Sequence, residues 1–377
     1  MTEPRPLSRV ERIDLSRADD PRDVVHRAVA TLAQGERVLL AADGLCGVLA
    51  SALHPEAVGQ FRVASAPATP LDAPTLLIRG ADELSDWVPT LSTVGRRLAR
   101  RAWPGPITLV FPDPGDQGLF PRLHPSVRST LTTDQGVAIQ VPSPPFVRDV
   151  LRLLPAPPVF RPLRRADLAG PDGIETVAAQ CRLVVESERK GNGPGTAVVR
   201  VEDDHLTVLN PGPLDEFTLA RLSATVILFV CTGNTCRSPM AEALCKVLIA
   251  ERLGCAVGEL GERGVLVLSA GVAAMQGMPA ATNAIDVVRA RGGALEGHRS
   301  SRVTFELVRD ADLIVAMTAD HLETLLDQVP EAAPRARLLH PQGLDVADPV
   351  GADRDTYQRT AEEIESYLRL MLDTLSF

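Results

Sequence analysis

The second part of the sequence alternates apolar strand-like runs with helix-like runs, and this alternation restricts the fold more than any other feature. The predicted strands are residues 225–230, 265–268, 312–317 and 337–339. The predicted helices are residues 239–253, 280–291, 319–328 and 353–375. Strands joined by helices form right-handed crossovers, which predicts an α/β domain with a four-stranded parallel sheet. Ligands bind such sheets at the carboxyl ends of the strands, so the loop that starts at Cys231 is the place to expect chemistry.

The preceding residues show a different pattern, with many short strands and few helices. The predicted strands are residues 38–42, 75–78, 107–111, 137–141, 182–186, 196–201 and 206–209. Helices are predicted at 22–34 and 82–103, and the prolines of 142–171 predict loops and edge strands. This pattern indicates a mixed α/β domain that ends in a short helix at 214–222. We therefore expect an N-terminal extension (1–19), a first domain (20–222) and a second domain (223–377).

Composition excludes several classes of protein. The net charge is −9, so the chain has no general affinity for nucleic acid or anionic membrane. No run approaches the roughly 18 apolar residues of a membrane span, and the first residues lack the apolar core of a signal peptide. The six cysteines are too few and too irregular for a disulfide framework. We expect a cytoplasmic protein with no membrane partner.

Residues 231–238 read Cys-Thr-Gly-Asn-Thr-Cys-Arg-Ser, between a strand and a proline that opens a helix. A glycine-bearing loop that ends at a helix start turns its backbone N–H groups inward and forms a cradle for a tetrahedral anion. The same amides and the helix dipole would stabilise the thiolate of Cys231 and make it a nucleophile. Arg237 could hold two phosphate oxygens with its planar fork, and Ser238 could donate a hydrogen bond to the sulfur. The alternative, a small buried cysteine at a strand end, leaves the accompanying residues unexplained.

Such a nucleophile needs an acid that protonates the leaving group. Asp348, followed by Pro349, comes after the fourth predicted strand and should reach the same edge of the sheet. Asp-Pro is also a common turn, and the residues alone leave that alternative open.

The second domain, residues 225–377, resembles the low-molecular-weight protein tyrosine phosphatase family. The resemblance rests on VCTGNTCRSPMAEAL and on the shorter segments Ser269-Ala270-Gly271, Gly297-His298-Arg299-Ser300, residues 312–317 and Asp348-Pro349. It implies that Cys231 is the nucleophile, that Arg237 binds phosphate, and that Asp348 is first a general acid and then a general base. The phosphate-binding loop would consist of Thr232, Gly233, Asn234, Thr235, Cys236 and Ser238. The implied substrate is a phosphorylated protein, with no metal or other cofactor.

The phosphorylated residue is phosphoarginine or phosphotyrosine. Thr235 in the loop is similar to the bacterial protein-arginine phosphatases of this family, where a threonine at this place favours phosphoarginine. Val350 departs from those relatives, which tend to carry an aromatic residue there. Thr235 could also be a plain packing residue, so both substrates stay open, with phosphoarginine preferred.

Two other interpretations concern cysteines. Arsenate reductases share this scaffold but relay electrons through further cysteines, and none follows Cys255 here. Cys236 could form a protective disulfide with Cys231, or could simply fill the loop.

Residues 20–215 resemble the YrdC/Sua5 family of threonylcarbamoyl-AMP synthases, which use ATP, threonine and bicarbonate in tRNA modification. The clearest segment is WPGPITL at 103–109, followed by weaker similarity around Asp43 and Gly47. Cationic residues that the family needs are missing: Gln140 and Asn210 stand in place of arginines, and no Lys-x-Arg pair follows Phe61. A site for triphosphate cannot easily lose these cations.

We therefore expect the first domain to be catalytically inactive and to regulate or scaffold the phosphatase. The alternative is a bifunctional protein whose first domain binds nucleotide or RNA, at least weakly, or makes threonylcarbamoyl-AMP. Arg96, Arg97, Arg100 and Arg101 could contact RNA, although a solvated basic helix face is the simpler interpretation. The glycine-rich residues 190–195 lack the ending of a phosphate loop and predict an inter-strand turn.

Overall fold

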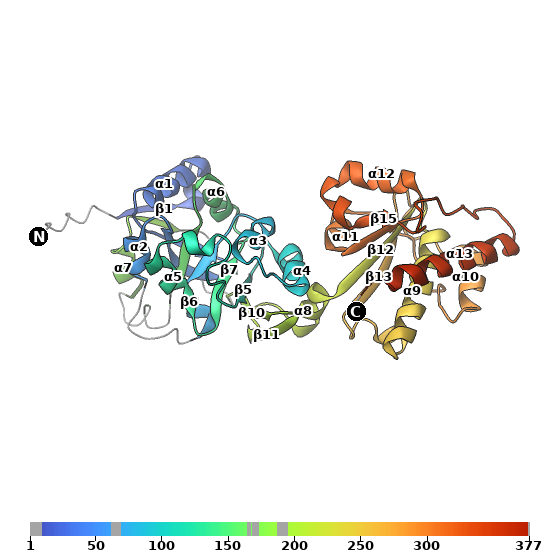
Figure 1. Cartoon of the computed structure of the whole chain (residues 1–377). Helices are drawn as coiled ribbons and strands as arrows, with labels where there is room; N and C mark the ends of the chain where they lie inside the picture. Colours follow the sequence, from blue (N-terminus) through green and yellow to red (C-terminus); the bar gives the residue numbers. More distant parts are fainter. Residues whose placement is uncertain (1–9, 62–68, 164–166, 168–172, 187–194, 376–377) are drawn as a thin grey trace, which may run out of the picture. The chain divides into compact units, whose positions relative to one another are not determined.

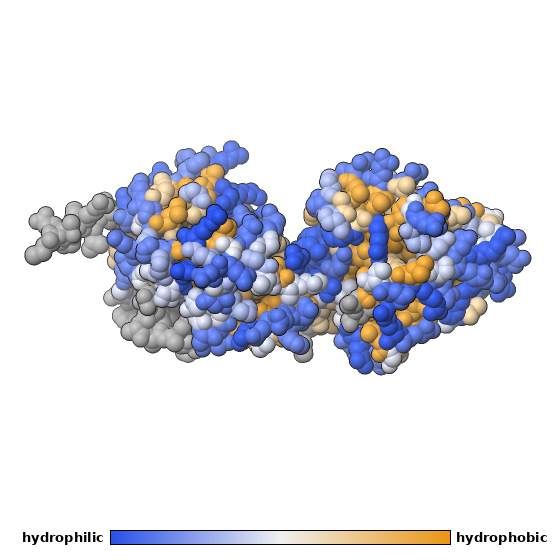
Figure 2. All heavy atoms as spheres, in the orientation of Figure 1, coloured by the Kyte–Doolittle hydropathy of each residue, from blue (hydrophilic) through white to orange (hydrophobic). Residues whose placement is uncertain are grey.

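The computed structural model describes residues 10–61, 69–163, 167, 173–186 and 195–375. The chain divides into two compact units, Met1–Leu219 and Ala220–Phe377 (Figure 1). The helix α8 (Glu216–Ser223) contains the point of division. No helix of the described residues is long and apolar enough to cross a membrane. Hydrophilic residues cover most of the face seen in Figure 2.

The first unit is built on one mixed sheet of eleven strands, in the order β1-β9-β2-β3-β8-β4-β7-β5-β10-β11, with β6 paired to β7. The strands are β1 (Glu11–Asp14), β2 (Val38–Ala42), β3 (Leu45–Ser51), β4 (Thr75–Leu77), β5 (Ile107–Phe111), β6 (Thr132–Thr133), β7 (Gly136–Gln140), β8 (Pro158–Pro162), β9 (Leu183–Glu186), β10 (Ala197–Glu202) and β11 (His205–Asn210). The helices are α1 (Pro21–Ala33), α2 (Pro55–Gly59), α3 (Leu84–Trp87), α4 (Thr93–Ala102), α5 (Pro125–Leu131), α6 (Pro145–Leu153) and α7 (Gly173–Ala178), with single turns η1 (Leu15–Arg17), η2 (Pro70–Asp72), η3 (Ala81–Glu83) and η4 (Phe120–Arg122).

The main core of this unit lies between α1, α6 and the strands beneath them. Leu32 of α1 and Val150 of α6 are fully buried against Leu49 of β3, because apolar residues recur on one face of each helix. The side chain of Asp20 caps α1 by accepting a hydrogen bond from the backbone N–H of Arg22 (2.9 Å).

Three predictions for this unit are wrong. The helix predicted at 82–103 is divided into α3 and α4, because Pro89 has no N–H to continue a helix and Ser92 caps a new one by accepting from the N–H of Gly95. The proline-rich stretch contains α6 and also β8, which lies between β3 and β4 inside the sheet. The sheet accepts β8 because its prolines occupy the two ends of the strand.

The third correction concerns the basic helix face. Arg101 is buried, since it lies three residues after the buried Leu98 and therefore on the same face of α4.

The second unit has a parallel sheet of four strands in the order β13-β12-β14-β15. The strands are β12 (Thr225–Cys231), β13 (Val265–Gly271), β14 (Leu313–Ala316) and β15 (Ala336–Leu338). The helices are α9 (Arg237–Leu253), α10 (Thr282–Arg289), α11 (Phe305–Asp310), α12 (Ala319–Gln328) and α13 (Arg354–Leu372), with turns η5 (Val257–Glu259) and η6 (Pro330–Arg335). The predicted α/β class, with a mixed first unit and a four-stranded parallel second unit, is confirmed.

Alternation along β12 places the helices on both faces of this sheet. Ile227 and Phe229 pack in one cluster with residues of α9, α10 and α13, whereas Val226 and Leu228 pack in another with residues of α11 and α12. Figure 1 shows these two groups of helices on the two sides of the sheet. All four side chains are buried. The sheet is thus covered on both faces, and its carboxyl edge, where β12 ends at Cys231, carries the loops.

Candidate active site

The loop between β12 and α9 holds Cys231 at the carboxyl edge of the sheet. Cys231 pairs in register with Gly271 of β13, and its residue surface is only 3% exposed. A Cβ atom at Gly271 would lie 2.4 Å from the carbonyl oxygen of Thr232 and 3.0 Å from the backbone nitrogen of Asn234. A glycine is therefore required at position 271 for the loop to approach β13 this closely.

Two donors converge on the sulfur of Cys231. The backbone N–H of Asn234 donates to Sγ at 3.2 Å, and Ser238 Oγ lies 2.9 Å from Sγ. Asn234 has φ +55°, a left-handed conformation that asparagine tolerates better than most residues, and this conformation turns its N–H inward. Donors in these positions stabilise a thiolate more than a thiol.

The side chain of Asn234, fully buried, fixes the direction of the hydrogen bonds around the sulfur. Its Oδ1 accepts from the backbone N–H of Ser301 at 2.8 Å, so its Nδ2 donates to Ser238 Oγ (3.0 Å) and to Ser269 Oγ (2.9 Å). Ser269 in turn donates to Glu242 Oε2 (2.5 Å). Because Ser238 Oγ accepts from Asn234, the hydroxyl proton of Ser238 is left to donate. Its two acceptors are Cys231 Sγ, 2.9 Å from Oγ, and the carbonyl oxygen of Ala270, 3.3 Å from Oγ, so the sulfur is the nearer one.

Arg237 and Asp348 are brought together at the same edge. Arg237, 5% exposed, pairs through Nη2 with Asp348 Oδ2 and donates through Nη1 to the carbonyl oxygen of Val346 (3.1 Å). The side chain of Asp348 is 39% exposed, and its Oδ1 accepts from the backbone N–H of Val350 (3.2 Å). The structure therefore places the predicted nucleophile, the predicted phosphate ligand and the predicted acid around one loop.

Two further loop residues, Thr235 and Cys236, contact residues outside the loop. Thr235 accepts through its carbonyl oxygen from the N–H of Ala281 (2.9 Å), and Cys236 Sγ lies 3.1 Å from Tyr357 Oη. Burial, followed by the hydrogen bond with Cys236, raises the pKa of Tyr357 well above its usual value. Tyr357 therefore stays protonated at neutral pH and can donate to the sulfur of Cys236.

Sequence reasoning missed several residues that contact the loop. The ring of His298 donates through Nε2 to the carbonyl oxygen of Asn234 (2.8 Å), and that of His321 lies 2.7 Å from Thr232 Oγ1. Burial, and then the charge of Arg237, lowers the pKa of His321. His298 and Glu242 belong to segments that carried the family resemblance, whereas His321 and Tyr357 lie on α12 and α13, where nothing in the local sequence sets them apart.

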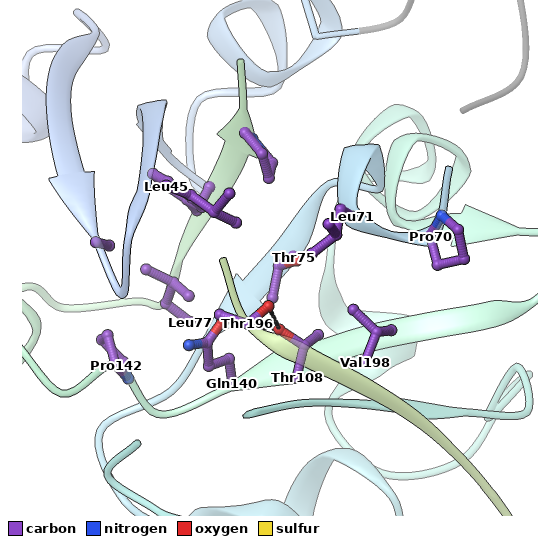
Figure 3. A pocket seen from close by; sticks show the side chains of 13 residues that line it. Leu45, Pro70, Leu71, Thr75, Leu77, Thr108, Gln140, Pro142, Thr196 and Val198 are labelled. Carbon is purple, nitrogen blue, oxygen red and sulfur yellow. Dashed lines mark hydrogen bonds between the residues drawn. The ribbon is translucent and has the colours of Figure 1, made fainter. Parts of the chain in front are cut away.

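In the first unit, Gln140, one of the positions where the YrdC resemblance expects an arginine, lines a small pocket (Figure 3). Asn210, another such position, is not among its lining residues and donates through Nδ2 to the carbonyl oxygen of Thr196 (2.9 Å). Thr108 Oγ1 donates to Gln140 Oε1 (2.9 Å) and lies 3.1 Å from Thr196 Oγ1, while Gln140 Nε2 donates to Asp43 Oδ2 (2.8 Å). Figure 3 shows Thr108, Gln140 and Thr196 gathered at the centre, with leucines and prolines around them. The lining consists of Ala42, Leu45, Pro70, Leu71, Thr75, Leu77, Thr108, Gln140, Pro142, Phe160, Pro162, Thr196 and Val198.

The space left between these side chains is about 10 Å³, room for a single water molecule. No arginine or lysine lines this pocket among the described residues. Residues 62–66, where the resemblance expects a Lys-x-Arg pair, lie outside the described residues, as does all of the turn predicted at 190–195 except Gly195.

The geometry of the second unit defines a class of protein. A buried thiol at the end of a parallel strand, surrounded by donors and followed by an arginine at a helix start, is the arrangement of a cysteine-dependent phosphatase. Residues 226–376 match the family model described as low molecular weight phosphotyrosine protein phosphatase. The protein-arginine-phosphatase of Bacillus subtilis (strain 168) is 40% identical over 153 residues, which are 40% of this chain and 95% of that protein. The chain belongs to the low-molecular-weight protein phosphatase family and is a hydrolase of that family.

The chain is also similar to the following proteins. The low molecular weight protein-tyrosine-phosphatase Etp of Escherichia coli (strain K12) is 34% identical over 149 residues, 39% of this chain and 92% of that protein. A crystal structure of a YwlE mutant from Bacillus subtilis is 39% identical, covers 40% of this chain and 97% of that chain, and has a TM-score of 0.35. Residues 30–212 match the Sua5/YciO/YrdC model, described as telomere recombination. Both family resemblances drawn from the sequence are confirmed.

Proposed function

We propose that the second unit hydrolyses phosphorylated protein side chains through a cysteinyl-phosphate intermediate. The thiolate of Cys231 attacks phosphorus, and the bond between phosphorus and the leaving group breaks as Asp348 gives that group its proton. Asp348 then removes a proton from the water that attacks the phosphocysteine, which releases inorganic phosphate and regenerates the thiolate. The observation that supports this proposal most strongly is the convergence of Asn234 N–H and Ser238 Oγ on the sulfur of Cys231.

The loop residues Thr232, Gly233, Asn234, Thr235, Cys236 and Ser238 would surround the phosphoryl group, and Arg237 would hold two of its oxygens. Arg237 is paired with Asp348 in the structure, so a phosphate dianion competes with the carboxylate for the same guanidinium. Binding of substrate would thus release Asp348 from Arg237. This exchange would prepare Asp348 to act as the acid.

We propose phosphoarginine as the preferred substrate. Thr235 lies in the loop at the place where the arginine-specific relatives carry threonine, and relatives in Bacillus subtilis and Geobacillus stearothermophilus are named protein-arginine-phosphatases. Val350, 68% exposed after the Asp-Pro pair, offers no aromatic ring to stack on a phosphotyrosine ring, but it also departs from the arginine-specific relatives, so this position does not separate the two substrates. Phosphotyrosine is the second candidate, because other relatives are named tyrosine phosphatases.

The test is phosphate release by the full chain from matched phosphoarginine and phosphotyrosine peptides, with Cys231→Ser as the blank. Release that is faster from the phosphoarginine peptide supports the proposal. Faster release from phosphotyrosine would contradict the role of Thr235, and Thr235→Ile should then leave the preference unchanged. Release that does not depend on Cys231, from either peptide, would contradict the proposed mechanism.

We further propose that the chain functions as two domains, residues 20–222 and 223–377, and that the first regulates or scaffolds the second without synthase activity. The uncharged side chain of Gln140, at a position where the YrdC resemblance expects an arginine, supports this, because ATP carries several negative charges that need cationic partners. ATP at 1 mM should therefore leave the unfolding temperature of the first unit unchanged. A rise in that temperature, or ATP-dependent formation of threonylcarbamoyl-AMP, would favour the bifunctional alternative. The cytoplasmic location stays a prediction.

A further inference from the structure

The first turn of α12 contacts both loops that carry the proposed chemistry. The buried ring of His321, 6% exposed, lies between Thr318 Oγ1 (2.8 Å from Nδ1) and Thr232 Oγ1 (2.7 Å from Nε2). On the other side of the turn, the backbone N–H of Ala319 donates to Asp345 Oδ1 (2.8 Å). Thr232 follows the nucleophile directly, and Asp345 precedes the acid by three residues.

Hydrogen-bond directions show what each contact does. Thr318 Oγ1 accepts from the backbone N–H of His321 (3.3 Å), which leaves its own proton for Nδ1 of the neutral ring. Nε2 then carries the ring proton and donates to Thr232 Oγ1, so the hydroxyl proton of Thr232 is directed away from the ring. The contact thereby orients the hydroxyl of a residue at the start of the phosphate-binding loop.

Asp345 connects two distant segments. Its carboxylate accepts from the first N–H of α12, where the helix dipole favours a negative charge. The next residue, Val346, donates its N–H to the carbonyl oxygen of Met317 (2.8 Å) and accepts from Arg237 Nη1 (3.1 Å). The segment that carries Asp348 is therefore held on one side by α12 and on the other by the phosphate-binding arginine.

We propose that Asp345 and His321 are positioning residues for the reaction proposed above, and that the first turn of α12 braces the acid loop against the nucleophile loop. Neither side chain reaches the reacting atoms: Asp345 acts through the placement of Asp348, and His321 acts through Thr232. We call the contact of Asp345 with α12 the Asp345 arm and the contact of His321 with Thr232 the His321 arm. Loss of the Asp345 arm should slow only the substrates whose leaving group needs a proton, because it acts through the acid. Loss of the His321 arm should slow every substrate, because it acts through the loop of the nucleophile.

The Asp345 arm is tested with phenyl phosphate, which leaves as a weakly acidic phenol, and 2,4-dinitrophenyl phosphate, whose phenol needs no protonation. In the full chain, Asp345→Ala should lower kcat/KM for phenyl phosphate about tenfold and for the dinitrophenyl ester less than about twofold. Asp345→Asn keeps an acceptor for the Ala319 N–H and should restore most of the loss. Asp348→Asn is the reference for the same pattern, and thermal unfolding checks that each variant is folded.

The His321 arm is tested by a double-mutant cycle. His321→Ala and Thr232→Val should each lower kcat/KM for both esters by the same factor, roughly fivefold, and the double variant should be no slower than the worse single variant. Losses that multiply in the double variant would overturn this arm.

Equal losses on the two esters in Asp345→Ala, with Cys231-dependent hydrolysis by the wild type, would overturn the inference alone. Hydrolysis by the wild type that does not need Cys231 would overturn the proposed function, and the inference with it.

Discussion

The two units treat their polar groups in opposite ways around Cys231 and around Gln140. Around Cys231, donors from the loop and from α9 point at one sulfur, and β13 and the segment after α10 hold them in place. Around Gln140, the polar atoms of Thr108, Thr196 and Asp43 satisfy one another, and apolar side chains fill the rest. Donors held toward a reacting atom favour catalysis, whereas donors paired within the protein favour stability alone. The comparison teaches that a scaffold can persist after its charged groups are gone.

The largest expected effect is on catalysis in the second unit. Cys231→Ser should reduce phosphate release from an aryl phosphate by at least about a thousandfold, because a serine hydroxyl at this site stays protonated and is a poor nucleophile. The matched control is Cys255→Ser, a partly buried cysteine outside the loop, which should keep wild-type activity. Comparable activity of the two variants would mean that Cys231 is not the nucleophile, and the contrast between a catalytic second unit and an inactive first unit would be lost.

The next effect concerns the buried amide that organises the loop. Asn234→Ala removes the hydrogen bonds to Ser238, Ser269 and Ser301 and leaves a Cβ at positive φ, so it should destabilise the second unit by about 2–4 kcal/mol. Asn234→Gly also loses the hydrogen bonds but has no Cβ, so it should be the more stable of the two. Calorimetry measures the effect in the full chain; equal stability of the two variants would show that the backbone conformation is unstrained.

A smaller effect is expected at Gln140, at the centre of the polar cluster of the first unit. Gln140→Leu leaves Thr108 and Asp43 without one partner each and should destabilise the first unit by about 1–3 kcal/mol, with phosphatase activity unchanged. Both tryptophans, Trp87 and Trp103, belong to this unit, so denaturant unfolding followed by tryptophan fluorescence reports on it alone. A change in activity would mean that the pocket communicates with the active site.

The smallest effect is a pH dependence in the second unit. The pKa of His321 is lowered on folding, so below the usual histidine value of about 6.5 the unfolded chain binds a proton that the folded chain does not. Stability should therefore be fully present above that value and decline as the pH falls toward the folded pKa. The variant His321→Gln has no titrating ring at this position. Calorimetry detects the unfolding of the second unit, which tryptophan fluorescence does not report. The midpoint temperature of that transition should fall less steeply between pH 7.5 and 5.5 in the variant than in the wild type. An unchanged slope would contradict the lowered pKa.

Much of this protein could be predicted from local pattern. The strand at Val38–Ala42, the helix at Ala319–Gln328 and the strand–loop–helix around Cys231 follow from periodicity, from the loop glycine and from the proline that opens a helix. These signals are local because an apolar period and a turn residue act within a few positions of the chain. The proline-rich strand β8 was missed because its place inside the sheet depends on two neighbours far away in the sequence, β3 and β4.

Periodicity was enough to predict the fold class, and the contiguous motif around Cys231 was enough to predict the nucleophile and the arginine that we propose. The family resemblance added Asp348 as the acid, because an Asp-Pro pair alone is also a common turn. Only the tertiary structure decided which side chains hold them. His321 and Tyr357 contact the loop from α12 and α13, Asp345 joins the segment of Asp348 to α12, and the pairing of Arg237 with Asp348 spans 111 residues. The physical reason is that hydrogen bonds and burial depend on distance in space, which the order of residues sets only after the chain has packed.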